Sequence, residues 1–296
     1  MDDIKNIIID FLKHRPEVLG AYGYGSGVFT QINNKLNQDT QIDIILVVEN
    51  MKKWHQQNMQ MNPQDYKRSA AKYLSNYEKK EKDLGSEITY LPFLKDANHT
   101  FKIGVISNKS FIRELEYWES YFIAGRFQKP INFIKSNSNF DNRIAKNRKK
   151  ALIIVLWKLY KEKSKGHTVT ELFEEICELS FMGDTRMLFV ENPRKVKNTV
   201  QGCFNEFKLM YTDDELYTLN EDETININRH NLFLSLLEYF DLDNFFEVSN
   251  KEIDNKFIKK NFTDSIIQTY KGLRTIGTAD SAKYVIQKVK KRIYQK

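Results

Sequence analysis

The stretch VLGAYGYGSG, residues 18–27, decides the first part of the fold, because an apolar run of strand type ends there in closely spaced glycines. Glycine lets the backbone turn sharply and bring its N–H groups against an anion, to which Ser26 could also donate its hydroxyl. No Lys-Ser or Lys-Thr pair follows and the spacing differs from G-x-G-x-x-G, so the stretch is neither a P-loop nor a dinucleotide fingerprint. By itself the turn fits a phosphate site and a purely structural role equally well.

The next strand-like stretch, IDIILVV at residues 42–48, carries one carboxylate within an apolar run. Burying Asp43 there costs free energy unless a cation or a hydrogen-bond donor compensates the charge, which favours a metal-binding aspartate. A buried cap or salt-bridge partner is the structural alternative. Lys102 falls in another expected strand, beside Gly104, and a buried ammonium also needs a partner. That partner is either an anionic ligand or Asp43 itself.

Strand and helix patterns alternate over the first 141 residues, as in an α/β domain. The expected strands are 18–24, 42–48, 88–94 and 100–106, and the expected helices are 2–14, 51–62, 69–82 and 110–121. Helices at 143–163, 168–180 and 193–211 then precede a hairpin pattern at 216–219 and 224–228, which is the outline of a winged-helix domain. We therefore expect domains at 1–141 and 142–230. A C-terminal helical region at 231–296, with a helix at 233–240, would complete the chain.

Composition narrows the class of protein. The chain has 296 residues, of which 41% are hydrophobic, and this is the composition of a folded protein of roughly two domains. Its longest apolar run, residues 151–157, is much shorter than the roughly 20 residues that span a bilayer. Two Cys and five His without zinc spacing argue against a disulfide framework and a structural zinc site. The net charge of +7 indicates an anionic partner.

Most of that positive charge lies at the C-terminal end. Residues 282–296 hold six Lys or Arg and no acid, so the rest of the chain is nearly neutral. Val285, Val289 and Ile293 recur every four residues, which would give a basic C-terminal helix an apolar edge. Such a helix would lie on an anionic membrane surface. The alternative is a terminal helix that docks on its own domain.

Several short sequence motifs, taken in order, resemble those of a known family. They are YGSGVF at 24–29, Ile42-Asp43, the spaced residues Trp54 to Tyr66, KIGVIS at 102–107, YFIAGRFQKP at 121–130, LSFMGDTRM at 179–187 and KVKN at 195–198. The set is similar to the mitochondrial translocator assembly and maintenance family, the peripheral phosphatidate cytidylyltransferases that make CDP-diacylglycerol. The resemblance runs from about residue 20 to residue 210 and returns weakly at Lys271-Gly272.

The resemblance implies a nucleotidyltransferase-like fold for the N-terminal domain. In that fold the turn Gly25-Ser26-Gly27 would hold the triphosphate, and strand carboxylates would hold Mg²⁺. The usual pair of carboxylates one residue apart is incomplete, since Gln41 and Ile45 flank Asp43 at that spacing. Only Asp43 matches as a metal ligand. The candidates for the remaining ligands are Asp39, Glu49 and Glu87.

A stripe of polar and aromatic residues follows the second strand. Trp54, Asn58, Asn62 and Tyr66 are spaced four apart and would share one side of a helix, although Pro63 would end that helix before Tyr66. Such a stripe suits a base and a ribose better than a lipid chain, so we expect these residues to bind substrate. In the alternative interpretation Trp54 belongs to the core and the asparagines cap helices or face solvent.

Basic residues farther along are expected to bind phosphate. Arg126 would supply a fork of donors and Lys129 a point charge, although exposed basic residues are often only solvated. In the loop after the 168–180 helix, Asp184 and Arg186 either pair with each other or reach a cleft between the domains. The remaining expected contacts from the second domain are Lys195 and Asn198.

The resemblance implies attack by a phosphate oxygen of phosphatidate on the α-phosphorus of CTP, with release of pyrophosphate. The nucleophile is already an anion, so no strong general base is needed, and the protein must offset the repulsion between two polyanions. We expect Asp43 and Lys102 to carry catalysis and Mg²⁺ to be the cofactor. The expected partners are CTP, phosphatidic acid and an anionic membrane surface, which the C-terminal tail would contact.

Two other classes of protein also fit the sequence. One is a nucleotidyltransferase for a soluble acceptor such as a sugar, a drug or an RNA end, which the turn and Asp43 fit equally. The other is a non-catalytic nucleic-acid-binding protein. We expect no nucleic-acid partner, because the basic excess lies in the tail and residues 168–180 hold four glutamates.

The expected location is the surface of a membrane. The first residues show no Arg-rich, acid-poor leader, so we expect a peripheral protein on the cytoplasmic face in a bacterium. If the chain is a processed eukaryotic form, the matrix side of the mitochondrial inner membrane is expected instead.

Overall fold

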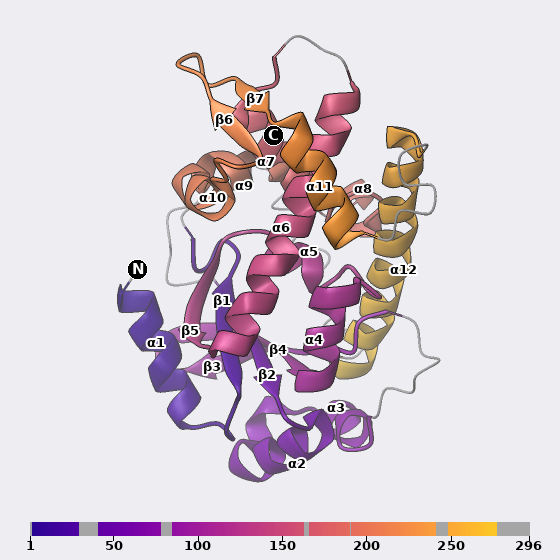
Figure 1. Ribbon diagram of the computed structural model, residues 1–296. Coiled ribbons are helices and arrows are strands. Elements are labelled where there is room, and N and C mark those ends of the chain that lie inside the picture. Colours follow the sequence, from indigo (N-terminus) through magenta and orange to yellow (C-terminus); the bar gives the residue numbers. More distant parts are fainter. Residues whose placement is uncertain are drawn as a thin grey trace.

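The computed structural model describes residues 2–29, 41–77, 85–162, 166–189, 191–240 and 248–276. A mixed five-stranded sheet in the order β3-β4-β2-β1-β5 forms the centre of the N-terminal part (Figure 1). All four expected strands are present, and β5 was not expected from the sequence. Asp39 and the basic tail at 282–296 lie outside the described residues. The strands are β1 (Gly20–Tyr24), β2 (Ile42–Val48), β3 (Thr89–Asp96), β4 (His99–Ser107) and β5 (Ile131–Lys135).

The register of the sheet places the expected catalytic residues side by side. β2 runs antiparallel to β1 and parallel to β4, so Asp43 lies opposite Tyr24 on one strand and Lys102 on the other. Successive side chains of a strand point to opposite faces of the sheet. Ile44 accordingly belongs to one hydrophobic core and Ile45 to the other. Asp43 shares the face of Ile45, since the two positions are two residues apart.

Helices cover both faces of the sheet, and we name the faces after them. The α2 face, on the side of Ile44, is covered by α1, α2 and α3. The α5 face, on the side of Ile45, is covered by α4, α5 and the start of α6. The bounds are α1 (Asp2–Lys13), α2 (Met51–Met61), α3 (Arg68–Leu74), α4 (Asn108–Tyr117), α5 (Ala124–Phe127) and α6 (Ser138–Lys161), with a 3-10 turn η1 (Pro63–Asp65) after α2.

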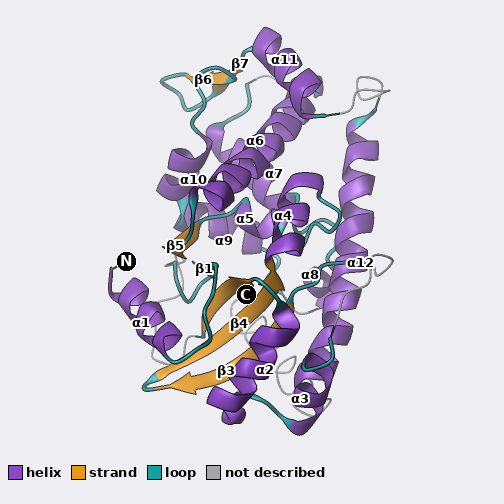
Figure 2. Ribbon diagram, turned by 60° about the horizontal axis from the view of Figure 1, so that its bottom comes forward, coloured by secondary structure: helices purple, strands orange, loops and turns teal. Residues whose placement is uncertain are grey.

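The second part of the chain is mostly helical and is joined to the sheet by α6 (Figure 2). Phe140 and Ile144 of α6 pack with the sheet, whereas its later residues lie in the helical core. Thr168 caps the next helix in a reciprocal capping box with Glu171. The elements are α7 (Val169–Glu178), α8 (Thr185–Phe189), α9 (Lys195–Gly202), α10 (Phe204–Tyr211), β6 (Tyr217–Leu219), β7 (Ile225–Ile227) and α11 (Arg229–Tyr239).

One expected helix of this part is wrong. The stretch 193–211 is not continuous, because Cys203 leaves the helical region at φ −131° and separates α9 from α10. Gly202 directly before it weakens the helix at this point. The expected hairpin is confirmed by the pairing of β6 with β7. The winged-helix assignment itself stays a prediction, as do the domain boundaries.

A long helix lies within the expected C-terminal helical region, although the sequence predicted neither its bounds nor its return to the N-terminal part. This helix, α12 (Asn250–Ile276), packs against β3, α3 and α8, and it lies along one side of the molecule in both ribbon views. Its buried Asp264 accepts hydrogen bonds from the Ser120 hydroxyl (3.0 Å) and the Tyr121 N–H (2.8 Å). Among the described helices, none is long and apolar enough to cross a bilayer.

Candidate active site

The glycine turn lies directly against Asp43. Gly25 has a φ of +76°, and a Cβ there would lie 3.3 Å from Oδ2 of Asp43. A Cβ at Gly27 would lie only 2.1 Å from the carbonyl oxygen of Gln41. Both positions therefore need glycine, the first for its conformation and its close approach and the second for space. Ser26 lies half-buried between them, so its hydroxyl is carried next to the carboxylate by the turn.

Asp43 and Lys102 form an ion pair across β2 and β4. The Nζ to Oδ1 distance is 3.3 Å, and about a quarter of each side chain is exposed (24% for Asp43 and 21% for Lys102). Lys102 Nζ also lies 4.6 Å from the centre of the Tyr90 ring. Gly104 leaves room for that ring, because a Cβ there would lie 2.5 Å from Tyr90. Asp43 is thus the partner of Lys102 in this structure, one of the alternatives that the sequence left open.

Two arginines face one aromatic ring beside this pair. Arg126 Cζ lies 4.3 Å from the Tyr24 ring and 5.1 Å from the Phe122 ring, and Arg186 Cζ lies 5.7 Å from the same Phe122 ring. Aromatic faces attract cations of this kind. Among the described residues, no acceptor bonds the buried Nε of Arg126, so this guanidinium keeps a donor for a ligand.

Asp184 and Arg186 pair with each other, which was one of their two expected arrangements. Nε of Arg186 donates to both carboxylate oxygens at 2.9 and 3.1 Å, and Nη2 donates to Oδ2 at 2.5 Å. Burial acts against both charges, but these bonds lower the pKa of Asp184 and raise the pKa of Arg186. The guanidinium is therefore held in a fixed orientation, with one side towards Phe122.

A second aromatic ring lies between two lysines. Lys129 Nζ donates to the Ser180 hydroxyl and lies 4.5 Å from the Phe181 ring. Lys195 Nζ lies 5.4 Å from that ring and is paired with Glu191 at 2.6 Å. Burial lowers the pKa of Lys129 to about 7, and neighbouring cations act in the same direction. An anion bound here would restore the charge of this lysine.

These five cations converge on the α5 face from four segments that are far apart in sequence. We call them the cation cluster. The carboxylates paired with the cluster, Asp43, Asp184 and Glu191, leave it with an excess of positive charge. Such an excess favours a polyanionic ligand. Asn198 lies one turn beyond the last of the cations on α9, and the contacts of the described residues do not tie its side chain to the cluster. The cluster consists of Lys102, Arg126, Lys129, Arg186 and Lys195.

The expected substrate-binding stripe lies on the opposite side of the sheet. Trp54 is buried in the core of the α2 face, and its indole N–H donates to the Pro16 carbonyl at 3.3 Å. Asn58 is fully buried and donates to the Tyr66 hydroxyl at 3.0 Å. Asn62 donates to Oδ1 of Asn58 at 2.9 Å. The structure therefore does not bring these four residues to the cation cluster, and it agrees with the alternative in which Trp54 is a core residue.

Charged and titratable groups complete this second cluster, which we call the α2 network. Arg15 pairs with Asp65 at 3.2 Å and donates to Asn62 at 2.8 Å. His55 lies 3.0 Å from the Tyr66 hydroxyl and 3.2 Å from the Thr89 hydroxyl. Burial lowers the pKa of His55 to about 3, so it is neutral at physiological pH. The network consists of Arg15, His55, Asn58, Asn62, Asp65 and Tyr66.

The donors available for a metal ion are few. Glu87 accepts hydrogen bonds from the Ser107 backbone and hydroxyl, and Glu49 lies exposed beyond the end of β2 remote from Asp43. In the described parts of the chain, no three side chains of His, Cys, Asp or Glu form a group that could hold a metal. Mg²⁺ often keeps several waters and takes one or two carboxylates together with substrate phosphates. The site fits that kind of Mg²⁺ binding, for which Asp43 is the available carboxylate.

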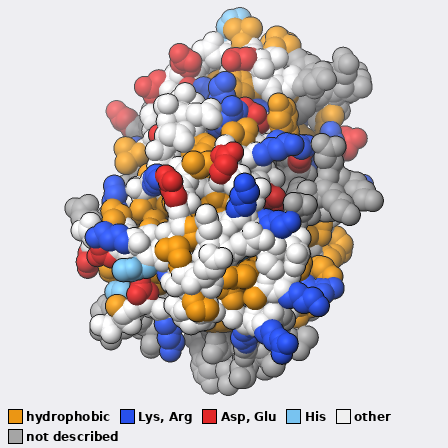
Figure 3. All heavy atoms as spheres, turned by 90° about the horizontal axis from the view of Figure 1, so that it is seen from below, with side chains coloured by type: hydrophobic (Ala, Val, Ile, Leu, Met, Phe, Trp, Pro, Cys, Tyr) orange, Lys and Arg blue, Asp and Glu red, His pale blue; other side chains and the backbone are white. Residues whose placement is uncertain are grey.

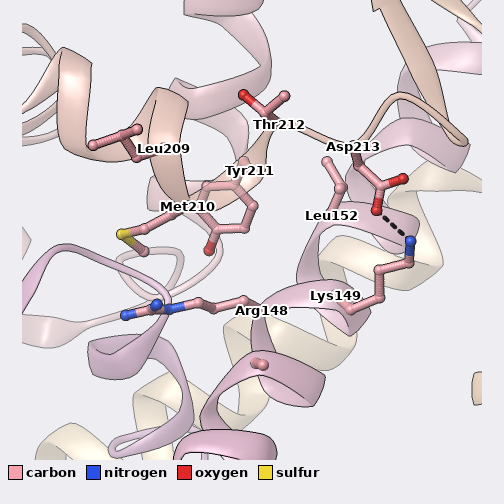
Figure 4. Close-up of a pocket in the computed structure, with 9 residues that line it drawn as sticks. Arg148, Lys149, Leu152, Leu209, Met210, Tyr211, Thr212 and Asp213 are labelled. Carbon is pink, nitrogen blue, oxygen red and sulfur yellow. Dashed lines mark hydrogen bonds and ion pairs between the residues drawn. The ribbon is translucent and has the colours of Figure 1, made fainter.

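A separate pocket of about 280 Å³ lies between α6 and the end of α10 (Figure 4). Arg148 in its wall donates to the Phe127 carbonyl at 3.0 Å, and the hydroxyl of Tyr211 donates to the Gln128 carbonyl at 2.7 Å. None of the residues that line this pocket was expected to bind substrate. Its walls instead fix the backbone of the segment that carries two members of the cation cluster.

Four aromatic residues of the site were not expected from the sequence. Three of them, Tyr24, Phe122 and Phe181, lie inside the short motifs that resemble the family. Each is close in sequence to a cation of the cluster or to the glycine turn. Their signal was therefore present but was assigned only to the charged neighbours. Tyr90 gave no local signal, because its place under Lys102 depends on Gly104 of the adjacent strand.

Comparison with known proteins identifies the family of the chain. Residues 5–233 match the profile of the family described as mitochondrial phosphatidate cytidylyltransferase. A relative of that name from Schizosaccharomyces pombe is 29% identical, over 93% of this chain and 80% of the relative. The relatives of that name from Saccharomyces cerevisiae and from mouse are 30% and 31% identical, over 89% and 68% of this chain and 64% and 59% of their own lengths. This chain belongs to the mitochondrial phosphatidate cytidylyltransferase family.

Proposed function

We propose that this chain transfers the cytidylyl group of CTP to phosphatidate at a membrane surface, which forms CDP-diacylglycerol and pyrophosphate for phospholipid synthesis. The observation that carries the proposal is the convergence of the cation cluster, the glycine turn and Asp43 on the α5 face. A reaction between two polyanions needs this arrangement, since their mutual repulsion must be offset before the reacting atoms can approach. The family of the chain supports the same activity.

In this proposal the residues of the cluster divide the work. Lys102 and the backbone of Gly25-Ser26-Gly27 hold the triphosphate next to β2, because they lie against Asp43. Arg126, with its unused Nε donor, and Lys129 bind a phosphate of the same nucleotide, between the sheet and the helical part. A phosphate oxygen of phosphatidate attacks the α-phosphorus, the bond from that phosphorus to the bridging oxygen breaks, and its electron pair leaves with pyrophosphate. No proton needs to be transferred in this step.

Asp43 would hold Mg²⁺, and bound Mg²⁺ would neutralise part of the charge on the triphosphate. Lys102 is paired with the same carboxylate, so its ammonium compensates part of the charge of Asp43 as well. The α2 network has no role in binding substrate in this proposal, because the side chains of Arg15, Asn58 and Asn62 bond to one another and to Tyr66 within the protein.

The location that we propose is peripheral, on the matrix side of the mitochondrial inner membrane, because the relatives are named as mitochondrial enzymes. The tail at 282–296 would contribute through its basic residues, at about 1 kcal/mol for each one near an anionic surface. Deleting residues 282–296 should therefore weaken sedimentation with acidic vesicles, most clearly at low salt. Undiminished sedimentation would show that this tail is not a docking element.

The activity can be tested by incubating the pure protein with α-labelled CTP, Mg²⁺ and phosphatidate in mixed micelles. Label should enter the organic phase only when phosphatidate is present. Binding of CTP without lipid labelling would contradict the proposed acceptor and favour a soluble one. A chain that binds no CTP would contradict the nucleotidyl transfer itself.

A further inference from the structure

The outward side of α12 carries a continuous apolar stripe. Its side chains are between 41% and 53% exposed, although large apolar side chains of a folded protein are usually covered. Residues four apart on a helix lie above one another, so the stripe follows the helix along most of its length. Its members are Ile258, Phe262, Ile266, Tyr270 and Leu273.

Beside the stripe, from residue 255 to residue 276, the exposed charges of α12 are of one sign. Lys256, Lys259 and Arg274 are exposed beside the stripe. The only acidic residue between positions 255 and 276 is Asp264, which is buried and bonded to Ser120 and the Tyr121 backbone. In the view from below, basic and apolar side chains lie together towards the right-hand edge, the side on which α12 runs (Figure 3). A helix that is apolar and basic on its outward side complements an anionic lipid surface.

The inward side of α12 holds the segment that leads to Arg186. Asn261 donates to the carbonyls of Leu179 and Met182, at 2.8 Å each. The Thr185 N–H donates to the Ser265 hydroxyl at 3.2 Å. A Cβ at Gly183 would lie 2.5 Å from the Ile258 carbonyl oxygen, so the segment and the helix backbone are in close contact. One helix therefore contacts the segment that leads to Arg186 on one side and exposes the apolar stripe on the other.

We propose that the outward side of α12 docks the protein on an anionic lipid bilayer, with the apolar stripe inserted at the level of the headgroups. This inference rests on the proposed function, because phosphatidate must be taken from a bilayer. It concerns an element outside the part of the chain that matches the family profile, which ends at residue 233. Docking through α12 brings the segment that holds Arg186 close to the lipid headgroups, since the helix binds that segment directly.

The test uses the full chain with Phe262→Ser and Ile266→Ser combined. The matched control combines Leu234→Ser and Leu237→Ser, which are equally exposed on α11 (49% and 47%). Binding is measured by sedimentation with vesicles of phosphatidylcholine containing phosphatidylglycerol, so that the substrate is not the ligand. The α12 variant cannot bury these two apolar side chains in the bilayer, so its vesicle binding should fall about tenfold or more. The control should bind like the wild type, and both variants should unfold at the wild-type temperature.

Activity separates this inference from the proposed function. The α12 variant should keep the wild-type rate on short-chain phosphatidate in detergent micelles and lose it on phosphatidate in vesicles. A wild type without activity on either would contradict the proposed function, while the vesicle binding would still test the docking. Unchanged vesicle binding by the α12 variant, or an equal loss in the control, would overturn the docking proposal. The docking proposal would also be overturned if the protein is a dimer that the α12 substitutions dissociate, because the stripe would then hold two copies together.

Discussion

The two faces of the central sheet both carry polar clusters, but the balance of their charges differs. In the α2 network the charges of Arg15 and Asp65 are paired, and the amides of Asn58 and Asn62 bond to neighbours. On the α5 face, carboxylates of the described residues pair with only three of the five cations, Lys102, Arg186 and Lys195. Among the described residues, the buried Nε atoms of Arg126 on this face and of Arg15 in the α2 network both have no acceptor, so the two faces differ in their charge balance. A polar network with balanced charges specifies a fold, whereas a cluster with excess positive charge favours an anionic ligand.

The largest expected effect is on the α5 face, at Asp43. Asp43→Asn keeps the size of the side chain but removes the charge that would hold Mg²⁺ and balance Lys102. Turnover should fall at least about 100-fold, in the range seen when a group that stabilises the transition state is removed. The pair is partly exposed, so the unfolding temperature should change little. An Asp43→Asn enzyme of near wild-type activity would contradict the metal assignment.

The opposite pattern is expected in the α2 network. Asn58→Ala should lower the free energy of unfolding by about 1–3 kcal/mol, because it leaves the buried Tyr66 hydroxyl and the Asn62 amide without this partner. The kcat and the KM for CTP should stay close to wild type. Denaturant unfolding and steady-state kinetics measure both, with the exposed Asn139→Ala as the control for stability. A large rise in KM at unchanged stability would instead support the stripe as a substrate site.

A smaller effect is expected from the charge of Lys129. Its pKa is lowered to about 7, so the side chain is protonated at pH 6 and mostly neutral at pH 8.5. The affinity for CTP should therefore fall as the pH rises through 7, by roughly threefold to tenfold, as expected for the loss of one buried charge contact. Lys129→Arg stays charged over this range and should flatten the dependence. Equal pH profiles for the two proteins would show that Lys129 does not control binding. The phosphate groups of CTP titrate in the same way in both experiments, so their titration does not contribute to a difference between the wild type and Lys129→Arg.

The sequence predicted the local parts of this site well. The strand that carries Asp43, the glycine turn before it and the place of Lys102 follow from apolar runs and glycines that are close in sequence. What the sequence did not decide was the face of the sheet. Asn58 and Arg126 both looked like ligands, because periodicity places residues on one side of an element without saying what covers that side.

The long-range parts could not be predicted, for a related reason. α12 has apolar residues both on its buried side, at Ile253 and Phe257, and on its exposed side, at Phe262 and Ile266, so its pattern does not show a single amphipathic stripe. The Tyr90 ring under Lys102 depends on a register between β3 and β4 that only the folded sheet sets. Contacts of this kind are properties of tertiary packing.

The most direct test of the difference between the two faces is the shift in unfolding temperature that CTP and Mg²⁺ cause in three proteins. A ligand that binds only the folded state stabilises it. We expect CTP to stabilise the wild type and Asn58→Ala by similar amounts and to stabilise Arg126→Ala much less. Loss of the CTP shift in Asn58→Ala, with a normal shift in Arg126→Ala, would place the nucleotide on the α2 face and contradict the account.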